Sequence, residues 1–156
     1  MQIRAEILAV DLPDTAAARI VIQAPPSKIF NLLADPKAHA LFDGSSTINK
    51  AISGPDRLSL GARFGMSMKI KVPYRITNEV VAFEENHKIT WRHLMKWTWS
   101  YELIDLGNGS TQVTEIFDAS VCNKAQRWWV HKTYSLNRNP KWMAKSLVKL
   151  KSLCEG

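Results

Sequence analysis

Residues 61–72 carry the pattern that most restricts how this chain can fold. Apolar side chains alternate there with small or charged ones along the whole stretch; the apolar positions are Ala62, Phe64, Met66, Met68, Ile70 and Val72. Successive side chains of a β-strand point to opposite faces of a sheet, so the pattern predicts a strand with one buried face and one solvated face. The buried face of such a sheet needs an apolar element to cover it.

The end of the chain supplies an element that can cover a sheet. Met143, Leu147, Leu150 and Cys154 are spaced so that they share one face of a helix, whereas lysines step by four along another face. We therefore predict a long helix over residues 140–154, with its apolar stripe packed against the strands.

The rest of the chain indicates more strands and two short helices. Besides 61–72, strands are predicted over 17–23, 47–52, 74–83, 88–93, 97–103 and 111–119, and the short helices begin at Pro26 and Lys37. Residues 1–15 form either a short strand or a loose N-terminal extension. This order predicts an α+β fold, in which a curved antiparallel sheet of about seven strands wraps around the C-terminal helix.

Length and composition exclude several classes of protein. A chain of 156 residues predicts a single domain, 1–156, with a substantial core. No apolar run approaches the roughly 18 residues of a membrane span, and residues 7–10 are too short for a signal-peptide core. We expect a cytoplasmic protein in which Cys122 and Cys154 are reduced. Neither cysteine has a metal ligand at CxxC or CxxH spacing, and no phosphate-binding motif occurs, so neither a metal nor a cofactor is predicted.

The excess positive charge is confined to the last part of the chain. The formal net charge is +7, and residues 121–156 contain eight Lys or Arg and one acid, Glu155. This predicts either an anionic partner, such as a membrane surface or a nucleic acid contacting residues 124–151, or a solvated lysine face. Trp128 and Trp129 lie among these cations, and they either join such a contact or form a lid over a pocket.

Two stretches resemble a known superfamily. Residues 20–36 read IVIQAPPSKIFNLLADP, and residues 109–114 read GSTQVT. In this order and spacing they resemble the START/Bet v 1-like (SRPBCC) superfamily, whose members include polyketide cyclase/dehydrase-like and lipid-transport proteins. The resemblance covers about residues 17–153 and implies the helix-grip fold. Phe42 stands where relatives often have tryptophan.

The resemblance also implies a cavity between the sheet and the C-terminal helix. The alternation of side chains indicates which residues face it, and we expect the ligand-binding set to be Phe64, Met66, Met68, Ile70, Asn78, Trp91, His93, Trp97, Trp99, Tyr101, Met143, Leu147 and Leu150. The alternative is a solid core in which these side chains contact only each other.

Three polar side chains on the inward faces are candidates for catalysis: His93, Tyr101 and Glu115. A buried Glu115 beside His93 would form an acid/base pair with shifted pKa values. The alternatives are a satisfied contact between the two, or a bulge that turns Glu115 to water.

Three functions follow from these features. The first is binding or transport of a hydrophobic or aromatic small molecule, such as a lipid or a polyketide-like compound. The second is a polyketide cyclase/dehydratase-like enzyme that uses His93 with Tyr101 or Glu115. The third is an interaction protein that contacts an anionic partner through residues 124–151. The sequence leaves open whether the protein is a monomer or a homodimer.

Overall fold

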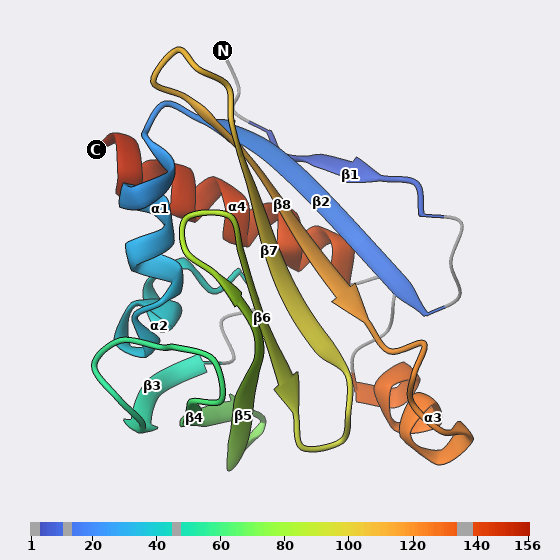
Figure 1. Ribbon diagram of the computed structural model, residues 1–156. Helices are drawn as coiled ribbons and strands as arrows, with labels where there is room; N and C mark the ends of the chain where they lie inside the picture. The colour runs from blue at the N-terminus through green and yellow to red at the C-terminus, as the bar shows by residue number, and fades with distance from the viewer. Residues whose placement is uncertain (1–3, 11–13, 45–47, 134–138) are drawn as a thin grey trace.

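The computed structural model describes residues 4–10, 14–44, 48–133 and 139–156 (Figure 1). The elements within these ranges are, in order, β1 (Glu6–Leu8), β2 (Thr15–Ile22), α1 (Pro26–Leu33), the short 3-10 helix η1 (Pro36–Ala38), α2 (His39–Phe42), β3 (Ile48–Ser53), β4 (Arg63–Ile70), β5 (Val72–Glu84), β6 (Lys88–His93), β7 (Thr98–Asp105), β8 (Thr111–Asp118), α3 (Lys124–Thr133) and α4 (Asn139–Glu155).

The strands form one antiparallel sheet in the order β1-β2-β8-β7-β6-β5-β4-β3. Strands β3 to β8 follow one another as a meander, and β2 then pairs with β8 without a break in register from Thr15 to Ile22. Helix α4 lies across one face of the sheet, and α1 lies near its C-terminal end (Figure 1). The predicted α+β fold is confirmed. The additional strand is β1, which lies within residues 1–15 and pairs with β2.

The apolar stripe of α4 is buried as predicted. Met143, Leu147, Leu150 and Cys154 are each at most 2% exposed. Their helix packs mainly on β2, at one side of the sheet. Burial of whole aliphatic side chains removes apolar surface from water, so this contact is a main source of stability.

The reversal between β4 and β5 differs from the prediction. The sequence predicted a strand through Val72 that Pro73 would break, but Lys71 makes the turn with a φ of 62°. Ile70 and Val72 then face each other across a tight hairpin, and Pro73 lies inside β5, opposite Lys69. The backbone conformation of Lys71, rather than the missing N–H of Pro73, decides where the strand ends.

Gly44 allows the chain after α2 to lie directly against α4. Its backbone N–H donates a hydrogen bond to Ser146 Oγ, at 2.8 Å. A Cβ at position 44 would lie 2.3 Å from the backbone oxygen of Trp142, which is closer than two such atoms can approach. Only glycine fits here, and this contact fixes where Asp43 and Ser146 sit relative to the sheet.

Within the described residues, no helix combines the length and the apolar character needed to cross a membrane.

Replacing Leu147 by alanine tests the role of the α4 stripe. Leu147 is fully buried, so Leu147→Ala is expected to lower the free energy of unfolding by about 2–5 kcal/mol, because a cavity replaces packed atoms. Leu153 on the same helix is 40% exposed, so Leu153→Ala is expected to change it by less than about 1 kcal/mol. Urea unfolding of both variants measures the difference. Equal effects would contradict the packing described.

Candidate functional site

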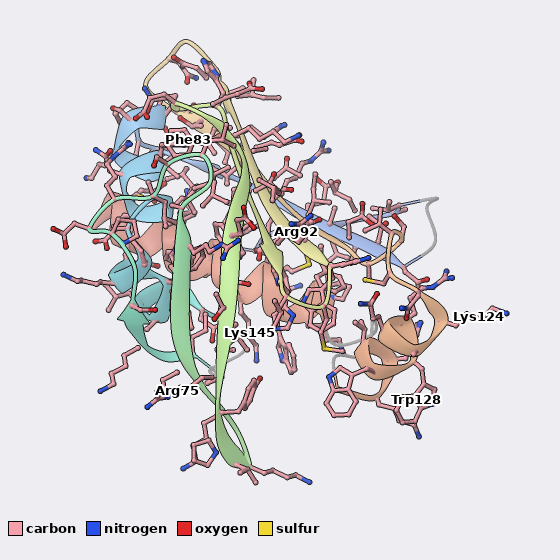
Figure 2. The ribbon with its side chains drawn as sticks, turned by 60° about the horizontal axis from the view of Figure 1, so that its bottom comes forward. Arg75, Phe83, Arg92, Lys124, Trp128 and Lys145 are labelled. Carbon is pink, nitrogen blue, oxygen red and sulfur yellow. The ribbon has the colours of Figure 1, made fainter. Side chains whose placement is uncertain are left out.

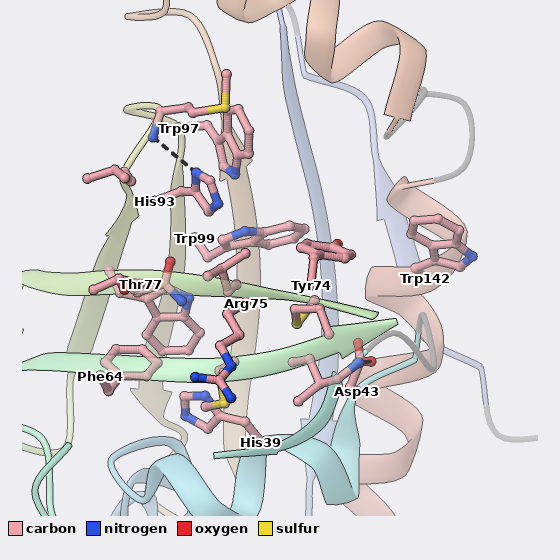
Figure 3. Close-up of a pocket in the computed structure, with 18 of the residues that line it drawn as sticks. His39, Asp43, Phe64, Tyr74, Arg75, Thr77, His93, Trp97, Trp99 and Trp142 are labelled. Carbon is pink, nitrogen blue, oxygen red and sulfur yellow. Dashed lines mark hydrogen bonds between the residues drawn. The ribbon is translucent and has the colours of Figure 1, made fainter. Parts of the chain in front are cut away.

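A cavity of about 900 Å³ opens between α4 and the inward face of the sheet (Figure 3). Its wall is built from β3 to β8, from α2 and the residue after it, and from parts of α3 and α4. Binding sites for organic molecules commonly measure about 300–1,000 Å³, with mostly apolar walls and a few polar groups. The interior is therefore not packed solid.

Most of the residues expected to bind a ligand line this cavity. They are Phe64, Met66, Met68, Asn78, Trp91, His93, Trp97, Trp99, Tyr101 and Met143, and the catalytic candidate Glu115 joins them. The pairing of strands explains why they share one face, since Phe64 lies opposite Asn78, which in turn lies opposite His93.

Three residues of the expected set stand apart. Leu147 and Leu150 are fully buried but are not among the lining residues, because α4 presses this part of its stripe onto β2. The prediction that Leu147 and Leu150 line the cavity is therefore wrong. The backbone of Ile70 belongs to β4, and its side chain lies outside the described part of the structure.

Glu115 and Tyr101 form the most buried polar pair of the wall. They lie directly opposite each other on β8 and β7, and each is 3% exposed. The Tyr101 hydroxyl donates a hydrogen bond to the Glu115 carboxyl group, yet burial still raises the pKa of Glu115 to about 8. Burial and the neighbouring Glu115 raise the pKa of Tyr101 well above its usual value. At neutral pH both groups therefore keep their protons.

One oxygen of Glu115 lacks a partner. Oε2 is buried and has no hydrogen-bond partner among the described residues. The sequence predicted that Glu115 would either contact His93 or be turned to water by a bulge, and both predictions are wrong. Its partner is Tyr101 rather than His93, and it does not face water, because β8 pairs with both neighbours without a bulge.

His93 is held as a neutral donor at another point of the wall. Its ring stacks on Trp97 with centroids 4.2 Å apart, and its Nδ1 accepts a hydrogen bond from the backbone N–H of Met95 at 3.0 Å (Figure 3). Burial lowers the pKa of His93 to about 4. Because Nδ1 is the acceptor, the proton of the neutral ring sits on Nε2, which can donate a hydrogen bond.

His39 lines the cavity but was not identified from the sequence. Its Nε2 donates a hydrogen bond to the Leu33 carbonyl oxygen at 2.8 Å, and its ring stacks on Trp91 with centroids 4.8 Å apart. Burial lowers the pKa of His39 to about 4. The four-residue helix α2 that carries it is too short to show a periodic pattern.

Other lining residues were missed as well. Tyr74 and Ile76 share the inward parity of Asn78 on β5, so the alternation could have identified them. Asp43, Trp142 and Ser146 enter the wall only through the contact between α2 and α4, for which the sequence carries no signal.

Helix α3 and two hairpin turns surround one end of the cavity, which Figure 2 brings forward. Among the lining residues here, Val72 is 68% exposed, Leu94 81% and Trp129 46%. The lining here also includes two lysines, Lys71 and Lys132. We call this region the mouth.

The two tryptophans expected to form a lid take different places. Trp129 lines the mouth, but Trp128 is 59% exposed and lies outside the lining, with Lys132 Nζ 5.8 Å from its ring centroid. Neighbouring residues of a helix point about 100° apart, so both could not face the cavity. Only the prediction for Trp129 agrees with the lining.

Part of the positive charge at the end of the chain is used within the protein. Arg127 and His131 contact Asp14 at 3.3 and 2.9 Å, which joins α3 to the start of β2. Lys149 donates to the backbone oxygen of Asp43, and Lys151 donates to that of Val21. Contact of residues 124–151 with an anionic partner stays a prediction.

Solved structures of other proteins share this architecture. Protein Ms6760 from Mycobacterium smegmatis superposes with a TM-score of 0.71 at 16% identity, covering 96% of both chains. The Polyketide_cyc-like protein Cgl2372 from Corynebacterium glutamicum gives 0.62 at 18% identity over 94% of both chains. The Aha1 dimer from Colwellia psychrerythraea gives 0.65 at 18% identity, covering 90% of this chain and 96% of that chain. The chain has the START/Bet v 1-like helix-grip fold.

Sequence comparison adds relatives of this helix-grip protein but no activity. The protein described as uncharacterized protein Rv0088, from Mycobacterium tuberculosis, is 36% identical over 107 residues, which cover 68% of this chain and 48% of the relative. The protein MT0096 from a second strain of that species is 35% identical over the same length. The chain thus spans about half the length of the curated relatives it matches. No family model matches it.

The buried groups of the helix-grip cavity predict how stability depends on pH. His39 and His93 titrate near 4 in the folded protein and near 6.5 when unfolded, so stability is lost as the pH falls from 6.5 to 4. Glu115 titrates near 8 when folded and near 4.5 when unfolded, so stability is lost as the pH rises between these values. Below pH 6.5 the two histidines outweigh the one glutamate.

We therefore predict maximum stability near pH 6.5 and a decline toward pH 8, where only Glu115 contributes. Urea unfolding across this range measures the profile. Glu115→Gln cannot titrate, so the decline above pH 6.5 should be absent in that variant. The same decline in both proteins would show that Glu115 is not its cause.

Proposed function

We propose that this protein binds a hydrophobic or aromatic small molecule, such as a lipid or a polyketide-like compound, in the cavity between the sheet and α4. The observation that carries the proposal is the size and chemistry of the cavity: about 900 Å³, with a wall made mainly of aromatic, methionine and aliphatic side chains. Transport of the bound molecule would require the same cavity and an opening.

The composition of the wall supports a flat or irregular apolar ligand. Trp91 and Trp99 face each other across β6 and β7 and offer rigid aromatic surfaces. Met66, Met68 and Met143 are flexible and polarizable, so they can adapt to the outline of a bound molecule. The mouth gives such a molecule a route from solvent, since several of its residues are well exposed.

A fluorescent apolar probe tests the proposal. We expect 1-anilinonaphthalene-8-sulfonate to bind the folded protein at one site with a large gain in fluorescence. Ile76 lines the cavity, so Ile76→Trp should fill part of it and weaken binding several-fold. Val81 lies on the same strand, is 38% exposed and is absent from the lining, so Val81→Trp is the matched control. Absence of binding, or equal affinities in the two variants, would contradict the proposal.

Catalysis on a bound polyketide-like compound is a second candidate function. The observation that favours it is that two neutral proton donors, His93 Nε2 and the carboxyl group of Glu115, line the same apolar cavity. A cyclase or dehydratase can use such donors to polarise a carbonyl group or to assist the loss of water. One of the solved structures with this fold is described as Polyketide_cyc-like.

Turnover of a poly-β-keto substrate tests this second function. His93→Ala is expected to abolish turnover, because it removes the donor, while thermal unfolding shows that the variant remains folded. Val81→Ala is the control, because Val81 lies on the outer part of β5, away from the wall. Full turnover in His93→Ala and in Glu115→Gln would exclude the mechanism.

A further inference from the structure

The buried carboxyl group of Glu115 has a hydrogen-bonding capacity that the described residues do not use. Tyr101 is its side-chain hydrogen-bond partner, whereas Oε2 has none among the described residues. Both side chains line the cavity and are 3% exposed. A buried polar atom without a partner is uncommon in folded proteins and calls for an explanation.

The protonation of Glu115 decides what its free oxygen can do. Burial raises its pKa to about 8, so the group is mainly a neutral acid at pH 7. A hydroxyl donor on Tyr101 already approaches one oxygen, so the acid proton belongs on the other oxygen, Oε2. Oε2–H is then a buried donor without an acceptor. This arrangement is energetically unfavourable unless a ligand supplies the acceptor.

Three described cations, Lys71, Arg75 and Lys132, line the cavity, and none of them is among the groups that shift the pKa of Glu115. Tyr101 faces it from β7, and Asp43, after α2, raises its pKa further. Ala18 lies opposite it on β2, and the residues that α4 adds to the wall are Trp142, Met143 and Ser146, none of which carries a charge. Among these described neighbours only the hydrogen bond from Tyr101 lowers the pKa of Glu115, and burial outweighs it, so the acid form is favoured.

The distribution of charge indicates which ligand group fits. Lys71 and Lys132 lie at the mouth, so an anionic group on a ligand would be held there, and an ammonium group would be repelled on entry. The buried acid favours a neutral acceptor, and aromatic and methionine side chains surround it in the wall.

We propose that Glu115 and Tyr101 form a polar subsite that takes a neutral oxygen acceptor, such as a ketone, quinone or ester carbonyl, on an otherwise apolar ligand. Because Oε2 is itself buried, a neighbouring side chain of the wall must shift before Glu115 Oε2–H can donate to the carbonyl oxygen. Tyr101 holds the carboxyl group in place through its other oxygen. The inference rests on the proposed function, because it assigns one group of a molecule that the cavity must first bind.

Two probes of nearly equal size and shape test the subsite. 2-Acetylnaphthalene carries a carbonyl group, and 2-isopropenylnaphthalene has a methylene group in its place. Calorimetric titration of the full chain at pH 6.5 should show that the carbonyl probe binds about five- to tenfold more tightly, as expected for one added hydrogen bond. In Glu115→Leu this ratio should fall to about one, because leucine offers no donor to the carbonyl oxygen.

A pH series with Glu115→Gln makes the test independent of the leucine variant, should that protein fail to fold. In the wild type the ratio should fall between pH 7 and 9, since Glu115 loses its donor on ionisation. Glutamine keeps an N–H donor at every pH, so its ratio should stay constant. A ratio near one in the wild type, or an identical pH profile in both proteins, would overturn the subsite while leaving the binding function intact. Failure of both probes to bind would overturn the binding function and the subsite together.

Discussion

The position at which α4 crosses the sheet determines what the rest of this protein can do. Its apolar stripe is buried mainly against β2, at one side of an eight-stranded sheet. The helix does not cover the whole inward face of β4 to β7, so side chains from both layers surround a space of about 900 Å³. A helix laid along the middle of the sheet would fill that space. Stability and the cavity thus arise from the same contact.

The polar groups of the wall are compatible with a low-dielectric interior because none of the buried ones needs to carry a charge at neutral pH. Burial lowers the pKa of His39 and His93 and raises that of Glu115, so in each case the neutral form is favoured. Each histidine also has one ring nitrogen fixed by a backbone hydrogen bond. The cavity therefore combines apolar surface with a few oriented hydrogen-bonding groups, which is the composition of sites that recognise neutral organic molecules.

Much of this arrangement could be predicted from the sequence, because the period of two along β4, β6 and β7 fixes which side chains point inward. Phe64, Met66, Trp91 and Tyr101 were found in this way. The same reasoning placed Glu115 inside but could not select Tyr101 as its partner, since that depends on the register of β7 against β8.

Other parts of the site depend on packing between distant segments, which sequence patterns do not encode. An apolar stripe has the same sequence pattern whether it packs in a core or lines a cavity. The sequence therefore could not show that Met143 lines the cavity and that Leu147 and Leu150 do not. His39 and Asp43 belong to a helix of one turn and the residue that follows it. Their positions depend on the chain around Gly44 resting on α4.

That contact has a consequence for how the protein can open. Gly44 is tied to Ser146, and the backbone oxygen of Asp43 is tied to Lys149, so two bonds join the end of α2 to successive turns of α4. The end of α2 and this part of α4 should therefore move together, and the part of the cavity wall that they form should keep its shape. Local opening that admits a ligand is expected instead at the mouth, where Arg127 and His131 of α3 contact Asp14 through partly exposed side chains and Val130 packs in the core.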